Sequence, residues 1–352
     1  MKILHFKYRS LGPCESFIER QLRLCSHVKQ IDAKFLYVRS TPNERNCPIP
    51  SIKGWRGLVS LLFRPRRLLP DLIHAHFGSN ALLIMGFAWI RRVPLMVSFY
   101  GHDVGSFPQG NRGINKLLYR ILFKIAFKVV AMTNAMKQEL VALGCSEKII
   151  VKYFVGVDPL RKRRKGSRRL SNLLMVSSLR PKKNHALVLK SLAKLRALGI
   201  ILKLRIIGAG PEDKKLKQMV KKFRLEEQVS FLGHIGDREK LSDHYEWADL
   251  MLHPSKRDEL GDQEGLPSSI VEAFSTGVAV ILSNHVDLKQ TFLGTGLYVD
   301  PISVAELVES IKILYQAPQN ISHLEVQSQR FFDENYADED YTKALCSLYV
   351  MT

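Results

Sequence analysis

The chain has 352 residues, 46% of them hydrophobic, and its 53 lysines and arginines against 33 acidic residues give a net charge of +20. This length favours two domains, and the hydrophobic content excludes a largely disordered chain. Five scattered cysteines without a Cys-x-x-Cys pair indicate buried thiols in a reducing compartment. We see no signal peptide before the first predicted strand and no apolar run long enough to span a bilayer, so we expect a cytoplasmic protein.

The positive charge is concentrated in the first half of the chain. Residues 1–170 hold 31 lysines and arginines and nine acidic residues, whereas the remaining residues hold 22 and 24. This asymmetry predicts an acidic partner for the first half, namely phosphate-bearing lipid, an anionic membrane or nucleic acid. Aromatic residues are not interleaved with the cations, which argues against nucleic acid. We therefore predict a membrane surface at the inner face of the cell membrane.

Three basic clusters carry much of this charge. Residues 55–69 place cations around an apolar stretch with aromatic residues at both sides, a pattern that suits a lipid interface. A second cluster forms a ridge along a helix whose apolar face includes Leu117 and Ile121, and residues 161–169 form a predicted linker. The ridge consists of Arg112, Lys116, Arg120, Lys124 and Lys128. Each cluster could instead be a solubilising face.

Short β-rich apolar runs alternate with helical patterns along the chain. Predicted strands in the first half are 3–8, 34–38, 72–77, 95–100, 129–133 and 149–154; those in the second half are 173–176, 204–207, 229–231, 250–252, 279–282 and 297–299. Helices are predicted between them, for example over 115–127, 186–198, 213–223 and 304–315. This alternation predicts an α/β fold of two doubly wound, Rossmann-like domains with parallel sheets, facing one cleft.

Two strand ends in the first half carry polar side chains. His74 and His76 share one face of a predicted strand, and because a third ligand is not nearby we interpret them as packed or substrate-side groups, not metal ligands. The next strand ends at a turn where Gly101 would let the backbone approach a ligand, with His102 and Asp103 exposed at the cleft. The alternative is a capped turn.

Strand ends in the second half carry glycines and cations. Arg180, Lys182 and Lys183 follow its first strand, where cations would face the cleft and meet a diphosphate. Gly208 and Gly210 form a turn between a strand and a helix, a common pattern that is weak evidence on its own.

The most informative stretch is 264–277, in which Glu264 and Glu272 flank a Gly-x-Pro turn and the start of a helix. Pro267 fits the first turn of that helix, whose free N–H groups favour an anion. The segment follows a buried strand, and such loops bind ligands in open α/β sheets. It thus offers two acceptors for sugar hydroxyls and a cradle for phosphate, as a nucleotide-sugar site requires. The alternative is a solvated helix face.

Taken in order, these segments resemble the retaining glycosyltransferases of family 4, which have the GT-B fold. The resemblance is carried by Tyr100-Gly101-His102-Asp103, Gly156-Val157-Asp158, Lys183-Asn184-His185, Gly208-Ala209-Gly210-Pro211, Val229-Ser230-Phe231-Leu232-Gly233 and residues 264–277. Residues 13–18 and the Glu-Gly-x-Pro variant look most like the subgroup that builds bacterial exopolysaccharide and lipopolysaccharide. The resemblance implies an acceptor-binding domain (1–165), a nucleotide-sugar-binding domain (166–332) and a terminal helix (333–352) that returns to the first domain.

The resemblance also implies roles for individual residues. Glu264 would contact the donor sugar, Lys183 would pair with the diphosphate, and His102 would replace the family's strand-end histidine, whose place Tyr100 takes. Glu272 would grip the ribose. The other donor-binding residues would be Arg180, Ser178, Gly208, Gly210, Gly233, His234, Gly265, Leu266, Pro267 and Ser268. The acceptor-side residues would be Tyr100, Gly101, Asp103 and Gly12.

The sequence departs from the family pattern in places that leave room for an altered donor or reduced activity. Ser178 stands where the family often has arginine, with Arg180 as the candidate substitute, and Gly12 stands alone where a glycine pair is usual. The implied reaction moves a hexose-type sugar from a nucleotide sugar to a glycan or lipid-linked acceptor, without metal or other cofactor. The alternatives are a catalytically silent relative that acts as an assembly factor, and another nucleotide-sugar enzyme such as an epimerase.

Overall fold

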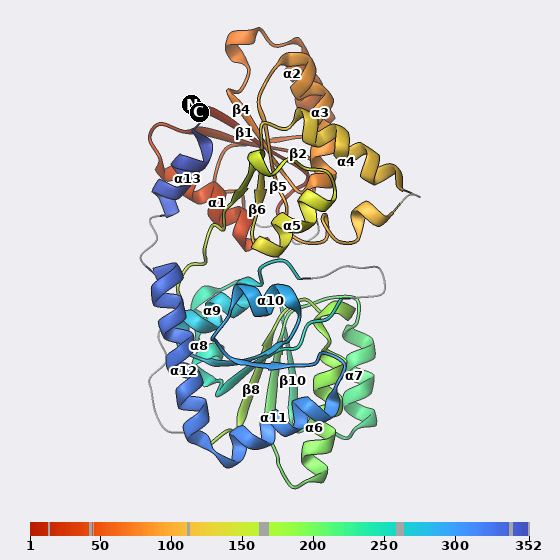
Figure 1. Cartoon of the computed structure of the whole chain (residues 1–352), viewed down its shortest axis with the longest axis vertical. Coiled ribbons are helices and arrows are strands. Elements are labelled where there is room, and N and C mark those ends of the chain that lie inside the picture. Colours follow the sequence, from red (N-terminus) through yellow and green to blue (C-terminus); the bar gives the residue numbers. More distant parts are fainter. Residues whose placement is uncertain are drawn as a thin grey trace. The chain divides into compact units, whose positions relative to one another are not determined.

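The computed structural model describes residues 1–12, 15–41, 44, 46–110, 113–161, 169–257, 264–337 and 341–350, except the side chains of residues 286 and 287. The chain forms two compact units (Figure 1). Unit 1 comprises Met1–Gly156, Leu260–Leu266 and Asp340–Thr352, and unit 2 comprises Val157–Glu259 and Pro267–Glu339. No contiguous division of the chain reproduces these units, because a short segment around Gly265 groups with unit 1.

Unit 1 is built on a parallel sheet whose strand order, over the described residues, is β3-β2-β1-β4-β5-β6-β7. The strands are β1 (Lys2–Arg9), β2 (Asp32–Arg39), β3 (Ser51–Lys53), β4 (Leu72–His76), β5 (Leu95–Ser98), β6 (Lys128–Ala131) and β7 (Ile150–Lys152). The order of the strands reverses between β1 and β4. In open α/β sheets, the carboxyl ends at such a reversal form a ligand-binding crevice.

Helices cover both faces of this sheet. They are α1 (Ser16–His27), α2 (Trp55–Phe63), α3 (Gly78–Arg91), α4 (Ile114–Ile125), α5 (Asn134–Ala142) and α13 (Tyr341–Tyr349), with short turns η1 (Arg66–Leu68), η2 (Phe107–Gln109) and η4 (Glu147–Ile149). Alternate strand residues feed two cores, since successive side chains point to opposite faces. One core includes α2, α3 and α4, and the other includes α1 and α13, which lie side by side (Figure 1).

Unit 2 has a parallel sheet of order β10-β9-β8-β11-β12-β13 over the described residues. Its strands are β8 (Asn172–Val176), β9 (Lys203–Ile207), β10 (Val229–Gly233), β11 (Leu250–His253), β12 (Ala279–Ser283) and β13 (Leu297–Val299). Its helices are α6 (His185–Ala197), α7 (Asp213–Lys222), α8 (Arg238–Trp247), α9 (Ser268–Thr276), α10 (Val286–Thr291), α11 (Val304–Gln316) and α12 (Pro318–Phe332), with η5 (Pro181–Lys183) and the π-helical turn η6 (Asp333–Ala337). Leucine-rich faces of α6 and α11 and apolar strand residues form its core.

The prediction of two doubly wound α/β domains is confirmed, and every predicted strand is present with ends shifted by one or two residues at most. The sequence pattern missed β3, which is three residues long and lies at the edge of the sheet. Buried parallel strands were recognisable because both of their faces are covered and their sequences read as continuous apolar runs. An exposed edge strand has no such run.

Candidate functional site

The turn after β5 is organised by the buried carboxylate of Asp103. Its Oδ1 accepts the backbone N–H groups of Tyr100 at 2.9 Å and Gly101 at 3.1 Å, and its Oδ2 accepts the N–H of Gly78 at 2.8 Å. The side chain is fully buried, and burial raises the pKa of the Asp103 carboxyl. The expectation that Asp103 is exposed at a cleft is therefore wrong, and the capped-turn alternative describes it, because a buried carboxylate needs these N–H donors.

His102, in contrast, is exposed at the same turn. Its Nδ1 lies 2.7 Å from the hydroxyl oxygen of Ser106. Its exposed side chain can meet a ligand from solvent. Its catalytic role stays a prediction.

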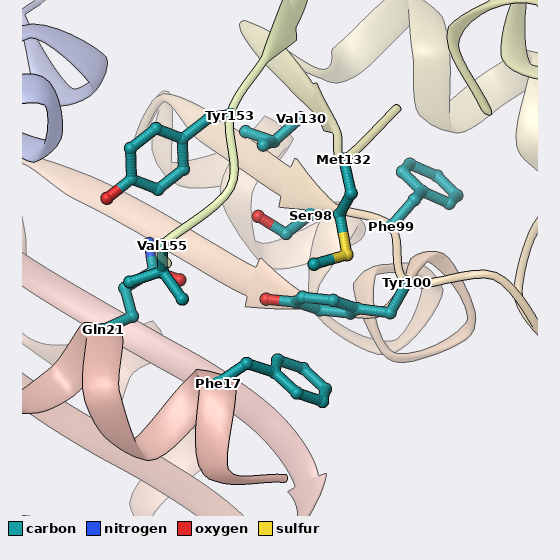
Figure 2. A pocket seen from close by; sticks show the side chains of 9 residues that line it. All are labelled: Phe17, Gln21, Ser98, Phe99, Tyr100, Val130, Met132, Tyr153 and Val155. Carbon is teal, nitrogen blue, oxygen red and sulfur yellow. The ribbon is translucent and has the colours of Figure 1, made fainter. Parts of the chain in front are cut away.

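Tyr100, which stands in place of the family's strand-end histidine, turns its hydroxyl into unit 1. Its ring lies against Phe17 and Phe77, with centroids 4.7 and 4.8 Å apart, and its hydroxyl lies 2.7 Å from Nδ1 of His76. Figure 2 shows the Tyr100 hydroxyl pointing into the space between Ser98 and Gln21. The small cavity there, of about 10 Å³, is lined by Phe17, Gln21, Ser98, Phe99, Tyr100, Val130, Met132, Tyr153 and Val155. It holds at most one water.

Behind Tyr100, side chains from five elements form a nearly closed ring of hydrogen bonds. In order around the ring the members are Tyr100, His76, His5, Cys25, Tyr349, His74 and Ser98. The successive donor–acceptor distances from Tyr100 to Ser98 are 2.7, 3.0, 3.6, 3.9, 2.9 and 2.7 Å. One direction of donation satisfies every member when each histidine is neutral and carries its proton on Nε2.

The ring keeps its histidines uncharged. Burial lowers the pKa of His5 to about 3 and lowers the pKa values of His74 and His76 well below their ordinary range. Burial also raises the pKa of the Cys25 thiol to about 12, so this sulfur stays a weak S–H donor. These neutral groups provide both hydrogen-bond partners that each imidazole requires.

The expectation that His74 and His76 lack a third ligand nearby is wrong. His5 on β1 pairs in register with His74, and the three histidines place nitrogen atoms within 4.8 Å of one another. The ring already uses both nitrogens of each imidazole, so packing explains the cluster without an ion. The prediction that the protein binds no metal stays a prediction. Sequence alone could not place His5 here, because the register of β1 against β4 decides it.

The loop after β1 is fixed by an ion pair. Glu15 accepts the N–H of Gly12 through Oε2 at 2.6 Å, and the same oxygen lies 2.8 Å from Nζ of Lys7, which is buried. Gly12 therefore lies at the carboxyl end of β1, as an acceptor-side residue would. Glu15 and Lys7 position it, and sequence reasoning missed both.

The Glu264 turn lies on the Tyr100 turn within unit 1. A Cβ at Gly265 would stand 2.5 Å from the carbonyl oxygen of Tyr100 and 3.5 Å from Cε of Met136, so only glycine fits. Leu266 packs against the unit 1 core, and Glu264 is nearly buried. The structure thus brings together two segments that the sequence analysis predicted separately for the donor and acceptor sides.

In unit 2, the carboxyl ends of β8, β9 and β10 are joined through glycine backbone. A Cβ at Gly208, whose φ is 144°, would lie 1.9 Å from the carbonyl oxygen of Ser177, and one at Gly210 would lie 2.5 Å from that of Leu179. The N–H of Gly208 donates to the carbonyl of Gly233 at 2.8 Å. These contacts hold the predicted donor residue Ser178 beside the glycine turn, with Gly233 and His234 following β10.

The predicted diphosphate-binding cations lie on a fixed loop. Arg180 precedes η5, which contains Lys183, and Asn184 ends this turn in the left-handed region with φ 59°. Asn184 donates through Nδ2 to the carbonyl oxygens of Pro254 at 3.0 Å and Pro301 at 2.6 Å. This side chain ties the loop to the ends of β11 and β13, so the cations stand on a braced support at the strand ends.

Glu272 lies on α9 with both carboxylate oxygens engaged. Oε1 lies 2.7 Å from Nη1 of Arg238, and Oε2 accepts the hydroxyl of Tyr245 at 3.2 Å. Arg238 also donates to the carbonyl of Asp158. Sequence reasoning missed Arg238 and Tyr245, because they come from α8 and only the fold brings them to Glu272.

Pro267 immediately precedes α9 and does not belong to its first turn. It is the N-cap residue, and the helix begins at Ser268, so the expectation of Pro267 in the first turn is wrong by one position. The N–H of Ile270 donates to the carbonyl of Pro267 at 3.1 Å. The anion-favouring N–H groups are then those of Ser268 and its neighbour Ser269.

Two family models match consecutive parts of the chain. Residues 27–159 match the description Glycosyltransferase Family 4, and residues 161–330 match Glycosyl transferases group 1. A putative colanic acid biosynthesis glycosyltransferase of Escherichia coli is 24% identical over 288 residues, 80% of this chain and 65% of that protein. Protein CapJ of Staphylococcus aureus is 29% identical over 282 residues, 74% of this chain and 68% of that protein. The chain thus spans about two thirds of the length of these relatives.

Solved structures share the fold over nearly the whole chain. The Anabaena protein HepE, crystallised with UDP and glucose, superposes with a TM-score of 0.80 at 18% identity and 99% coverage of both chains. The apo form of the lipopolysaccharide outer core galactosyltransferase WaaB superposes with a TM-score of 0.69 at 14% identity, covering 99% of this chain and 98% of that one. The GT-B fold is thereby shown.

Proposed function

We propose that the chain is a retaining glycosyltransferase that moves a hexose-type sugar from a nucleotide sugar to a glycan or lipid-linked acceptor in the synthesis of a bacterial surface polysaccharide. The observation that carries the proposal is the set of strand ends in unit 2, where a glycine turn without side chains lies beside the braced loop of Arg180 and Lys183. Backbone and cations at such strand ends suit a diphosphate. The matched glycosyltransferase families and the UDP bound by the Anabaena protein support this assignment.

In the proposed reaction, Lys183 and Arg180 pair with the diphosphate and stabilise its charge as the bond to the sugar breaks. Preorganised donors aimed at developing charge are the largest contribution in many enzymes. Glu264 orients the sugar through its hydroxyls, and the acceptor hydroxyl attacks on the face that the phosphate leaves. A phosphate oxygen takes the proton of that hydroxyl. The scheme requires no metal or other cofactor.

Glu272 keeps room for a ribose despite its two protein partners. A carboxylate offers about four lone-pair sites, and Arg238 and Tyr245 occupy one on each oxygen. The ribose hydroxyls can donate to the remaining sites. Arg238 and Tyr245 then act as positioning residues that fix the carboxylate before the donor arrives.

The proposed location is the inner face of the cell membrane, where a lipid-linked acceptor would be found. Over the described residues, no helix is long and apolar enough to cross a membrane. In this proposal, association is peripheral and uses the excess of positive charge in the first half of the chain.

The test compares Lys183→Ala and Glu264→Gln with Lys190→Ala, an exposed lysine on α6. Transfer is followed as release of nucleotide diphosphate, and binding as the rise in melting temperature with nucleotide diphosphate. We expect Lys183→Ala to weaken both, with turnover falling about 100-fold. Glu264→Gln should lower turnover far more than nucleotide diphosphate binding, and Lys190→Ala should change neither.

Full turnover in both site variants would contradict the proposed roles. Conversion of the nucleotide sugar into its epimer without any acceptor would assign the chain to the epimerase class. An unchanged polymer pathway in cells that carry the double variant would instead favour an assembly factor.

A further inference from the structure

Large apolar side chains are exposed where α2 and α3 end in unit 1. Phe63 is 81% exposed, Trp89 is 69% exposed and Ile90 is 64% exposed. Leu68, in the turn η1 after α2, and Trp55, at the start of α2, are also exposed. Isolated exposed hydrophobic residues are normal, but several aromatic and aliphatic residues at one place indicate an interaction surface. We call these five residues, with Arg56, Arg64, Arg66, Arg67 and Arg92, the α2–α3 surface.

Hydrogen bonds of Arg91 make this surface one structural unit. Its guanidinium donates from Nη1 to the carbonyl oxygen of Leu62 at 2.8 Å and from Nη2 to that of Arg64 at 2.6 Å. The end of α3 is therefore tied to the end of α2, which neighbours it in Figure 1. Trp89 and Ile90 also line an open groove of about 690 Å³ with Arg92 at its border. The exposed side chains thus belong to a common, braced support.

The α2–α3 surface is positively charged because the stretch of chain that forms it contains almost no acidic residues. From residue 45 to residue 102 the sequence contains one acidic residue, Asp71, against eight arginines and lysines. The carboxylate of Asp71 accepts the backbone N–H of Lys2 at 2.7 Å. Arg56, Arg66 and Arg67 are all exposed. Their charge therefore faces solvent without a compensating carboxylate from this stretch.

We propose that the α2–α3 surface docks onto an anionic lipid bilayer, with Phe63, Trp89 and Ile90 entering the interfacial layer and the arginines contacting headgroup phosphates. Tryptophan is favoured at membrane interfaces, where its ring lies at the depth of the headgroups. Arginine side chains can keep their charge at the headgroups while their stems cover apolar surface. The proposed function supplies the reason for the chain to be at a membrane, and the inference rests on it for that location only.

A second basic surface provides the matched comparison. On α4 the buried face is Asn115, Tyr119, Leu122 and Phe123. Leu117 and Ile121, expected on the apolar face opposite the cations, are exposed beside Lys116, Arg120 and Lys124, so that expectation is wrong for these two residues. This α4 face has similar charge but exposes no tryptophan or phenylalanine over the described residues. It tests whether charge with exposed aliphatic residues is sufficient when no aromatic residue is exposed.

The experiment is flotation of the full chain with phosphatidylcholine vesicles that contain or lack an anionic phospholipid, at low and high salt. The surface variants are Phe63→Ser/Trp89→Ser/Ile90→Ser and Arg56→Ala/Arg66→Ala/Arg67→Ala. The controls are Lys116→Ala/Arg120→Ala/Lys124→Ala on α4 and Ile201→Ser/Ile302→Ser, two exposed isoleucines of unit 2. All of these side chains are exposed, so the fold should persist, and melting temperature with nucleotide diphosphate checks it.

The wild-type chain should float only with anionic vesicles. Each arginine near such a surface contributes on the order of fivefold in partitioning, so the arginine triple variant should bind about 100-fold more weakly. The apolar triple variant should lose at least about tenfold and keep its dependence on salt. Both control variants should stay within about twofold of the wild type, which is the scatter expected for surfaces that do not touch lipid.

Three results would overturn the inference. The first is failure of the wild type to float with anionic vesicles, and the second is an equal loss in the α4 variant. The third is sedimentation showing self-association that the apolar triple variant abolishes while flotation is unchanged, which would assign the surface to a second copy of the chain. Transfer to a short soluble acceptor is measured in parallel. Persisting transfer without flotation would refute docking alone, and flotation without transfer would refute the proposed function alone.

Discussion

The carboxyl ends of the strands in the two units are built from different materials. In unit 1, buried side chains hold the strand ends in place. The Asp103 carboxylate accepts three backbone N–H groups, and the ring of histidines, Tyr349, Cys25 and Ser98 lies behind Tyr100. In unit 2, backbone contacts hold the strand ends in place, because Gly208 and Gly210 let the loop after β8 approach closely. Arg180 on that loop is exposed to solvent.

This difference teaches where substitutions should be felt. A buried polar network is costly when it is only partly satisfied, so changes at the unit 1 strand ends should first lower stability. A backbone cradle with exposed cations can lose a cation without leaving a buried group unpaired. Changes to such cations in unit 2 should lower ligand binding and turnover with little effect on folding.

The largest effect should come from Asp103→Ala. The substitution leaves the N–H groups of Tyr100, Gly101 and Gly78 without their buried acceptor. Each orphaned group costs roughly 1–3 kcal/mol, so the free energy of unfolding should fall by about 5 kcal/mol. Urea denaturation measures it, with Asp237→Ala as the control because Asp237 caps α8 at an exposed site. Equal losses of unfolding free energy in the two variants would contradict the prediction that the buried carboxylate stabilises the fold more than an exposed helix cap.

The next largest effect should come from acidification, which should destabilise unit 1 more than unit 2. His5 has a pKa of about 3 in the fold against an ordinary value of 6.5, and His74 and His76 shift in the same direction. Unfolded chains therefore bind more protons than folded ones below pH 6.5, so stability is full above that pH and is lost as pH falls toward 3. Between pH 7.5 and 5.5 the loss is about 1.4 kcal/mol for each histidine that stays neutral.

Unit 1 should lose more stability than unit 2 in this range. Unit 2 buries two histidines among its described residues, His185 and His253, and burial lowers the pKa of His185 to about 3. Hydrogen exchange at the two pH values, corrected for intrinsic rates, should show β1 and β4 losing protection more than β8 and β11. Equal losses would mean that the ring does not remain neutral in the fold.

These contrasts follow the limits of sequence reasoning. Apolar strands, glycine turns and the Glu264 stretch were recognisable because each is a local pattern. The ring was not, since Tyr349 and His74 are 275 residues apart and meet only through the packing of α13. The exposed face of α4 was misassigned for a related reason, because Tyr119 and Asn115 fill the core while Leu117 does not.

A substitution at Gly208 should have a smaller but localised effect in unit 2. Alanine there must adopt φ near 144° with its Cβ 1.9 Å from the Ser177 carbonyl oxygen, so the β8 and β9 loops must move apart. Strain and displacement of this kind cost about 3 kcal/mol. Nucleotide diphosphate binding should fall with stability, measured by titration below the melting temperature. Gly236→Ala is the control, since a Cβ at Gly236 would meet only His234 at 3.7 Å. Normal binding by Gly208→Ala would remove the glycine turn from the proposed donor site.

The smallest effect, and the sharpest test of the ring, should come from Tyr349→Phe. The lost hydroxyl accepts from Nε2 of Gln21 at 3.1 Å and from Sγ of Cys25 at 3.9 Å, and it lies 2.9 Å from Nδ1 of His74. Three buried groups therefore lose a partner while the aromatic volume stays. We expect a loss of about 2 kcal/mol in the free energy of unfolding, from roughly 1 kcal/mol each for the amide and the imidazole, since the thiol is only a weak donor. Tyr315→Phe, whose hydroxyl meets Arg169 at an exposed site, should change it far less. Because the ring connects Tyr349 through Cys25, His5 and His76 to Tyr100, hydrogen exchange should also quicken at the turn after β5. A stability loss confined to α13, with that turn unchanged, would show that the ring members act as separate pairs and not as one connected network.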